Sequence, residues 1–372
     1  MHSQDEKGSG YDLAVIGAGV IGLACAWRAA QAGMSVVVLE REEPGAGASG
    51  VAAGMLAPVT EAGFGEEELL RLNLEGRELW PGFAAELEEL TGMPTGYADT
   101  GALVVAADRD DAEELHRLHG FQRRLGLGSE WLGPRAARAL EPGLSPRIGG
   151  AILAPQDAQV EPAAVVAALA AALGNAGGEL RTGAEVTSLE TDSGRVTGVR
   201  TAAGDAVDAA QVLVAAGAWS SEGELATEAA APEVRPVKGQ LLELRVRRGG
   251  APPAGRLVRT PRCYIVCRPD GRVIIGATME EQGFDTTPTA GGVFRLLEAA
   301  YEVLPDTAEL EFVGARAGLR PFTRDNFPVV GPGAIDGLLW ATGHGRNGVL
   351  LAPHSARRVV ESLRSPERVA SA

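Results

Sequence analysis

A glycine-rich turn near the N-terminus constrains the fold more than any other feature of this sequence. Gly17, Gly19 and Gly22 follow the apolar β-forming run 11–16, and residues 23–32 after them are good helix formers. In a strand–turn–helix unit, Gly17 permits the tight turn, Gly19 lets the backbone approach a pyrophosphate, and Gly22 lets the helix lie close to the strand. The turn therefore indicates a parallel, doubly wound sheet that binds a dinucleotide.

The residue that follows the second strand supports this interpretation. The apolar run 35–39 ends on Glu40, 18 residues beyond Gly22. A carboxylate at this point accepts hydrogen bonds from ribose hydroxyls, while the helix N-terminus offers free N–H groups to phosphate. Arg41 could meet a 2′-phosphate, but the acid favours a free ribose hydroxyl. A turn without any ligand becomes the minority interpretation, although the turn alone does not separate FAD from NAD.

Charge and composition exclude several classes of protein. The 372-residue chain, long enough for about two domains, has a formal charge of −15, which repels nucleic acid and acidic membranes. It contains no run of about 18 apolar residues, and its polar leader 1–10 lacks the order of a signal peptide. Its three cysteines are too few for a disulfide framework, and no Cys/His cluster has zinc spacing. We expect a cytoplasmic protein without a metal, a membrane or a nucleic-acid partner.

Downstream patterns predict a return to the first sheet and then a second, largely antiparallel sheet. Helices are expected at 66–90, 110–125, 163–173 and 349–363, and strands at 185–189, 195–201, 211–216, 240–246, 263–268, 272–277 and 337–341. The stretch 237–278 is rich in strand patterns and contains turn signals such as 269–271. A glycine-rich turn at 343–348 repeats the order strand, turn and helix near the C-terminus.

Three further segments, read together with the N-terminal turn, resemble the D-amino-acid oxidase family of FAD-dependent oxidoreductases: residues 47–56, 214–220 and 343–353. The resemblance runs from Tyr11 to about Leu363. Within that family the chain is most similar in pattern to the glycine oxidases of the thiamin-pathway (ThiO) type, at residues 52–56, 263–266, 276–279, 318–321 and 346–348. No single one of these segments is specific for the glycine oxidases, but the five together are a strong indication.

The resemblance implies an α/β fold, in which a doubly wound Rossmann-like FAD-binding domain joins an α+β substrate domain with an antiparallel sheet. The FAD-binding domain is expected at 10–85, 147–220 and 320–364, and the substrate domain at 86–146 and 221–319. FAD contacts are expected at Gly17, Gly19, Val20, Ile21, Gly22, Glu40, Arg41, Ala48, Ser49, Ala53, Gly54, Met55, Val186, Gly217, His344, Gly345, Arg346, Asn347, Gly348, Val349 and Leu350. Because no cysteine lies near the turn at 343–348, the FAD is expected to be non-covalent.

An amino-acid substrate, which the resemblance implies, needs a cation for its carboxylate, and a guanidinium matches both carboxylate oxygens. The resemblance places this role on Arg320, with Tyr264 as a hydroxyl partner and Arg346 near the flavin ring. Arg268 and Arg316 are the rival cations. No side chain is assigned as an obligatory acid or base.

Strand alternation adds a prediction about the cysteines. Along residues 263–268, Tyr264 lies on the face opposite Cys263 and Cys267. If Tyr264 faces the flavin, both cysteines face away from it. They are then expected to be small buried hydrophobic residues and not a redox pair.

The expected reaction is oxidative deamination. The unprotonated amine passes a hydride from its α-carbon to flavin N5, water hydrolyses the imine to an oxo acid and ammonia, and oxygen is reduced to hydrogen peroxide. Glycine, sarcosine and small D-amino acids are the expected substrates, with thiamin biosynthesis as the pathway and a homo-oligomer as a plausible assembly. The alternatives are a dehydrogenase with another acceptor, sarcosine-oxidase-like N-demethylation, and an FAD-binding subunit without turnover.

The flavin turn contains one departure from the family pattern. Gly345 stands where many glycine oxidases carry an aromatic residue. The missing side chain is expected to enlarge or loosen the pocket. His344, beside it, is expected to pack or form a hydrogen bond and not to transfer a proton.

Overall fold

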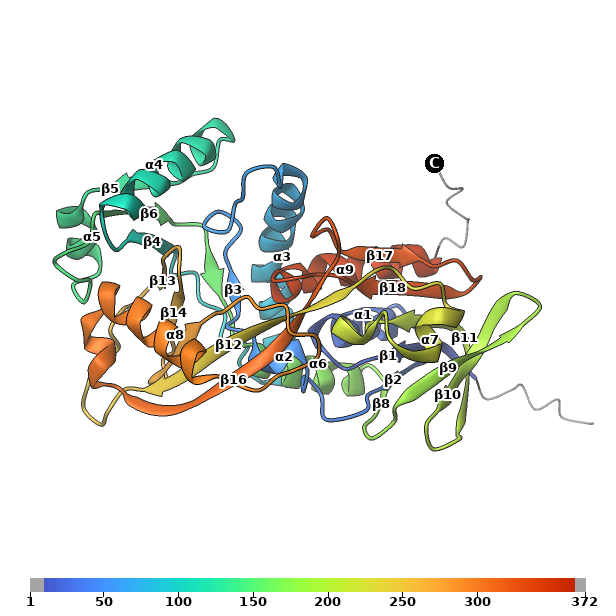
Figure 1. Ribbon diagram of the computed structural model, residues 1–372. Helices are drawn as coiled ribbons and strands as arrows, with labels where there is room; N and C mark the ends of the chain where they lie inside the picture. The colour runs from blue at the N-terminus through green and yellow to red at the C-terminus, as the bar shows by residue number, and fades with distance from the viewer. Residues whose placement is uncertain (1–9, 365–372) are drawn as a thin grey trace, which may run out of the picture.

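The computed structural model describes residues 10–364, which form two eight-stranded sheets (Figure 1). The first sheet has the order β17-β18-β11-β1-β2-β8, with the β9–β10 hairpin paired to β11. Its strands are β1 (Tyr11–Ile16), β2 (Val36–Leu39), β8 (Glu179–Arg181), β9 (Val186–Asp192), β10 (Arg195–Thr201), β11 (Ala206–Val214), β17 (Val329–Pro332) and β18 (Leu338–Thr342). The five strands from β18 to β8 run parallel, so the predicted doubly wound sheet is confirmed.

Both faces of β1 are buried, as expected for a central parallel strand. Leu13 and Val15 pack in the cluster that contains the helices, whereas Ala14 and Ile16 pack on the hairpin side. The helices of the first face are α1 (Val20–Gln31), α3 (Glu67–Thr91), α6 (Pro162–Asn175) and α9 (Gly348–Arg364). The short helix α7 (Gly223–Glu228) packs on the hairpin. Alternation along a single strand thus fixes which elements form each layer.

The second sheet has the order β16-β12-β15-β14-β13-β4-β6-β5 and is antiparallel except where β13 pairs with β4. Its strands are β4 (Ala102–Ala106), β5 (Glu130–Leu132), β6 (Gly150–Ala154), β12 (Arg235–Arg245), β13 (Leu257–Arg259), β14 (Tyr264–Cys267), β15 (Arg272–Gly276) and β16 (Glu311–Phe322). Helices α4 (Arg109–Arg124), α5 (Pro134–Leu140) and α8 (Ala290–Val303) lie around it, at the end of the molecule far from the β9–β10 hairpin (Figure 1).

Short elements and two long strands join the halves. The short elements are α2 (Ala48–Val51), β3 (Met55–Leu56), β7 (Ala158–Gln159) and η1 (Gly217–Trp219). A further short helix, η2 (Pro305–Glu309), packs against α8. Strands β12 and β16 pair over their whole lengths and extend from the second sheet to the middle of the molecule (Figure 1). There Phe322 forms an isolated bridge with His344, so the end of β16 meets the turn at 343–348.

The sheet membership of two strands differs from the expected domain boundaries. Residues 147–220 were expected in the FAD-binding domain, but β6 (Gly150–Ala154) pairs in the second sheet. Strand β16 (Glu311–Phe322) runs across the boundary expected at 319/320. We therefore propose that the chain returns to the FAD-binding domain after β6, because a strand belongs with the sheet that pairs it.

No helix within residues 10–364 is both long enough and apolar enough to cross a bilayer.

Candidate functional site

One cavity of about 1110 Å³ is lined by residues of both sheets and by segments that lie as far apart in the sequence as Ile16 and Val349. It extends from the turn after β1 to the strands of the second sheet. Most of the lining residues fall within 16–21, 39–55, 184–187, 215–225, 259–264, 276–280, 318–322 and 341–349, and the others are Glu61, Gly239, Leu241, Arg295, Leu296 and Glu298. Residues from distant parts of the sequence therefore contribute to a single site.

The dinucleotide turn has no room for side chains. Gly17 has a φ of 102°, and a Cβ on it would lie 2.7 Å from the Ala215 carbonyl oxygen. A Cβ on Gly22 would lie 2.0 Å from the Gly17 carbonyl oxygen. Neither position accepts an L-residue without moving the backbone. The helix N-terminus and this bare turn form a cradle that fits the pyrophosphate of FAD.

Two side chains hold the turn in place. The Glu40 carboxylate accepts a hydrogen bond from the Ala18 N–H at 2.7 Å, and the Ser49 hydroxyl accepts one from the Val20 N–H at 3.0 Å. Both side chains line the cavity. A carboxylate has capacity for further donors, so Glu40 can also accept from ribose hydroxyls.

Arg41 is held away from a phosphate-binding role. Its guanidinium carbon lies 4.0 Å above the Trp219 ring, and its Nε lies 3.2 Å from the Glu42 carboxylate. Stacking on the ring and pairing with the acid both use its charge. This arrangement agrees with a free ribose hydroxyl at Glu40.

The turn 343–348, between β18 and α9, contains the buried side chain of His344. Its Nε2 lies 2.8 Å from the Ser355 hydroxyl. Burial, with a smaller contribution from His354, lowers the pKa of His344 to about 3. The imidazole is therefore uncharged at neutral pH, which fits the expected packing and hydrogen-bonding role.

The space beside Gly345 is filled and not empty. A Cβ on Gly345 would lie 2.9 Å from Cε1 of Phe322, and Gly345 has a φ of 54°. The Phe322 ring packs against the bare backbone at this point, and the expected effect of Gly345 on the size of the pocket stays a prediction.

Arg320 and Tyr264 both line the cavity, and glycines make room for each. A Cβ on Gly239 would lie 2.3 Å from Nη1 of Arg320, and one on Gly276 would lie 2.3 Å from the Tyr264 hydroxyl. Arg320 donates to the Thr278 carbonyl at 3.1 Å. Burial raises the pKa of Tyr264, against the opposing charge of Arg320, so its hydroxyl stays protonated. The guanidinium of Arg320 and the hydroxyl of Tyr264 can therefore both donate hydrogen bonds to an anion in the cavity.

The rival arginines lie elsewhere. Arg268 is buried against Glu161, with 3.3 Å between Nε and the carboxylate, and donates to the Ala53 carbonyl. Arg316 pairs with Glu243 at 2.9 Å. Neither lines the cavity.

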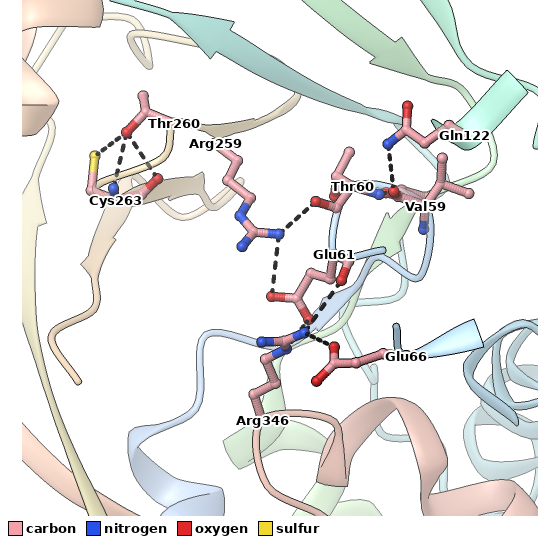
Figure 2. Close-up of polar contacts among 10 residues, drawn as sticks. Val59, Thr60, Glu61, Glu66, Gln122, Arg259, Thr260, Cys263 and Arg346 are labelled. Atoms are coloured by element: carbon pink, nitrogen blue, oxygen red, sulfur yellow. Dashed lines mark hydrogen bonds and ion pairs between the residues drawn. The ribbon is translucent and has the colours of Figure 1, made fainter. Parts of the chain in front are cut away.

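Arg346 belongs to an ionic cluster that no sequence motif indicates (Figure 2). Its Nη2 lies 3.1 Å from the Glu66 carboxylate, and its Nε lies 3.8 Å from Glu61. On the other side of Glu61, Arg259 lies 3.7 Å from the carboxylate and donates to the Thr60 carbonyl at 2.6 Å. The only sequence signal for Glu61 is that it is the first charged residue after the uncharged run 44–60.

A buried carboxylate supports the loop that carries Glu61. Asp157 accepts hydrogen bonds from the Val59 and Thr60 N–H groups at 3.1 and 2.9 Å. The Gln122 amide donates to the Val59 carbonyl at 2.8 Å (Figure 2). These bonds fix the loop whose acid faces Arg346 and Arg259.

Three expected cofactor residues do not line the cavity. Gly22 packs on the Gly17 carbonyl, Asn347 is buried behind the turn, and Leu350 lies in the core with its carbonyl accepting from Trp80 at 2.9 Å. All the other expected cofactor and substrate residues border it.

The side chains of Cys263, Tyr264 and Cys267 lie on the strand faces that were predicted for them. Cys263 and Cys267 pack with the core of the second sheet, whereas Tyr264 packs with the cluster on its other face. Cys263 also borders the cavity, but burial raises its pKa to about 11. Both cysteines are free thiols, and the described residues include no group of three or more His, Cys, Asp or Glu side chains that could hold a metal ion.

Comparison with known proteins agrees with this geometry. Residues 12–362 match the family model DAO, described as FAD dependent oxidoreductase. The chain is 35% identical to glycine oxidase from Geobacillus kaustophilus, over 96% of this chain and 94% of that protein. It is 36% identical to the bifunctional protein ThiO/ThiG from Trichormus variabilis, covering 95% of this chain but 52% of that protein. The solved glycine oxidase of G. kaustophilus has a TM-score of 0.89 at 35% identity, covering 97% of this chain and 96% of that one.

Proposed function

Because the chain belongs to the DAO family of FAD-dependent oxidoreductases and acts on amino acids, we propose that it oxidatively deaminates glycine. Sarcosine and small D-amino acids are further proposed substrates. The products are an oxo acid, hydrogen peroxide and ammonia, with methylamine in place of ammonia when the substrate is sarcosine. The names of the relatives, glycine oxidase and ThiO/ThiG, support this choice of substrate and a place in thiamin biosynthesis.

The observation that carries the proposal is the meeting of Arg320, Tyr264 and the flavin turn in one cavity. Arg320 keeps donors free for a carboxylate beyond its bond to the Thr278 carbonyl. The protonated Tyr264 hydroxyl donates a further hydrogen bond. Together they fix the carboxylate and so orient the α-carbon of the substrate.

The other site residues set the surroundings of the reaction. Bound non-covalently in the cradle of glycines, FAD supplies the acceptor for the hydride that leaves the α-carbon. The neutral His344 keeps a positive charge out of the turn, and the N-terminal amides of α9 stabilise negative charge there. Arg346, held by Glu61 and Glu66, borders the substrate end of the cavity.

No side chain needs to act as a general base, because the substrate amine reacts in its unprotonated form. The Phe322 ring and the buried turn line the cavity and limit the contact of bulk water with it. Water then adds to the imine and releases ammonia. This division leaves binding, orientation and desolvation to the protein.

The test is to purify the protein with its flavin and measure peroxide and ammonia from glycine, sarcosine and D-alanine. Equal yields of the two products from glycine are expected. Flavin that is reduced by glycine but reoxidises slowly in air would contradict oxygen as acceptor and favour a dehydrogenase. Conversion of sarcosine to glycine, without release of methylamine, would favour N-demethylation instead.

A further inference from the structure

Phe322 and Gly345 form a matched pair at the substrate end of the cavity. The Phe322 ring occupies the space that a Cβ on Gly345 would enter, with its Cε1 and Cδ1 only 2.9 and 3.1 Å from that point. Real Cβ atoms do not approach ring carbons so closely without displacement of the ring. An aromatic residue at position 345 and Phe322 in its present position therefore exclude each other.

The backbone holds this ring firmly. Phe322 bridges to His344, and the Gly345 N–H donates to the Pro321 carbonyl at 2.8 Å. On the opposite strand, Arg235 lies across from Phe322 in the register, and its guanidinium carbon is 5.9 Å from the ring centroid. The ring is only 5% exposed. The ring is thus packed between the turn and Arg235 of β12.

The same ring stands beside the proposed carboxylate anchor. Phe322 and Arg320 are two residues apart on β16, so their side chains leave the same face of the strand. Both line the cavity. Phe322 therefore bounds the part of the cavity next to Arg320.

We propose that Phe322 determines substrate size. The Phe322 ring is an aromatic wall that β16 supplies to the cavity, and Gly345 is the complementary residue that makes room for it. The proposal rests on the proposed amino-acid oxidation. It assigns the pocket to amines with no side chain or a short one on the α-carbon, and it makes Phe322 the residue that rejects bulkier ones.

The selectivity test compares Phe322→Ala with wild type on glycine and D-leucine, using the FAD-loaded enzyme. Removing the ring is expected to raise the ratio of kcat/KM for D-leucine over glycine by at least about tenfold, because one or two methylene groups in an apolar pocket are worth about that much. Phe327→Ala removes a surface phenyl five residues along and serves as the control. An unchanged ratio in Phe322→Ala would overturn the proposal.

The packing test is a double-mutant cycle read by Tm and by retention of FAD. Gly345→Phe alone is expected to lower both, because its side chain meets the Phe322 ring. The same change in a Phe322→Gly background is expected to lower Tm and FAD retention less and to restore the glycine preference. The strain of a positive φ at position 345 is common to both backgrounds and cancels. Equal damage in the two backgrounds would contradict the complementary pair.

The two tests also separate this proposal from the proposed function. If no amine reduces the flavin of the wild type, the proposed function and the proposed role of Phe322 both fail. If glycine reduces the wild-type flavin but Phe322→Ala keeps the wild-type selectivity, only the proposed role of Phe322 in substrate size fails.

Discussion

Arg320 owes its position to a glycine on the neighbouring strand. Its guanidinium lies where a side chain of Gly239 would be, and a bond to the Thr278 carbonyl orients it. Arg316, on the same strand, pairs with Glu243 away from the cavity. Two arginines of one strand thus differ in role because of their diagonal neighbours on β12, Gly239 and Glu243.

Gly239→Ala should therefore weaken substrate binding while FAD stays bound. A Cβ 2.3 Å from the Arg320 guanidinium must displace it, and we expect kcat/KM for glycine to fall at least tenfold, or about 1.4 kcal/mol. Gly314→Ala on β16, where a Cβ meets no atom within 4 Å, is the control. Steady-state kinetics of both variants would check this, and unchanged kinetics in Gly239→Ala would contradict the placement of Arg320.

His344 should make stability depend on pH. Its folded pKa of about 3 lies below the ordinary 6.5, so the unfolded chain takes up a proton that the folded chain does not. The stabilisation is complete above 6.5 and is lost as pH falls from 6.5 toward 3. Between pH 6.5 and about pH 5, wild type should lose about 1.5 kcal/mol more than His344→Gln.

Urea unfolding of both proteins at the two pH values measures this difference. His116→Gln, at an exposed position on α4, is the control for loss of a histidine. Parallel losses in wild type and His344→Gln would show that His344 is not buried neutral.

At the scale of elements, regular periodicity was enough to predict α1, α3, α4, α6, α9 and most of the first sheet. Strand β16 was missed because small residues and arginines interrupt its apolar pattern and because an edge strand needs little burial. Helix α8 was missed because it begins Ala-Gly-Gly. Its Gly292 is required by tertiary contact, since a Cβ there would lie 2.4 Å from the Gln240 side chain.

The same limit applies to the site. The motifs predicted Arg320, Tyr264 and the two glycine turns because each lies within a short recognisable segment. Glu61, Arg259 and Phe322 have no such motif, and only the fold brings them to the cavity. Contacts between distant segments carry no local signal, which is why the ionic cluster and the aromatic wall could not be predicted.

The first helix supplies an element-scale prediction. Gly22→Ala places a methyl group 2.0 Å from the Gly17 carbonyl oxygen, so α1 must move away from β1. We expect loss of FAD binding and a lower Tm. Gly82→Ala in α3, where a Cβ meets no atom within 4 Å, should keep FAD and raise the free energy of unfolding by up to about 1 kcal/mol. Normal FAD binding by Gly22→Ala would contradict the tight helix–strand contact.

At the scale of the molecule, the two sheets share one cavity, to which the first contributes the dinucleotide turn and the second contributes Arg320 and Tyr264. FAD that fills this cavity would touch both halves. Cofactor binding should therefore stabilise the whole fold and not one domain alone.

Free FAD at about 100 times its Kd should raise the free energy of unfolding of the apoprotein by about 2.7 kcal/mol. Calorimetry should show one transition that moves to higher temperature with FAD. Acid denaturation should also release all the flavin into solution. A transition that splits, with only one part responding to FAD, would contradict a cavity shared by both halves. Flavin that stays with the precipitated chain would contradict non-covalent binding.

The central claim is that Arg320 holds an amino-acid carboxylate against the flavin in this cavity. The most direct measurement is the rate at which glycine reduces the bound flavin without oxygen, in wild type, Arg320→Ala and the control Arg316→Ala. We predict that all three retain FAD, that wild type and Arg316→Ala are reduced at similar rates, and that Arg320→Ala at the same low glycine concentration is slower by about 100-fold or more. Reduction of Arg320→Ala at the wild-type rate would contradict the claim.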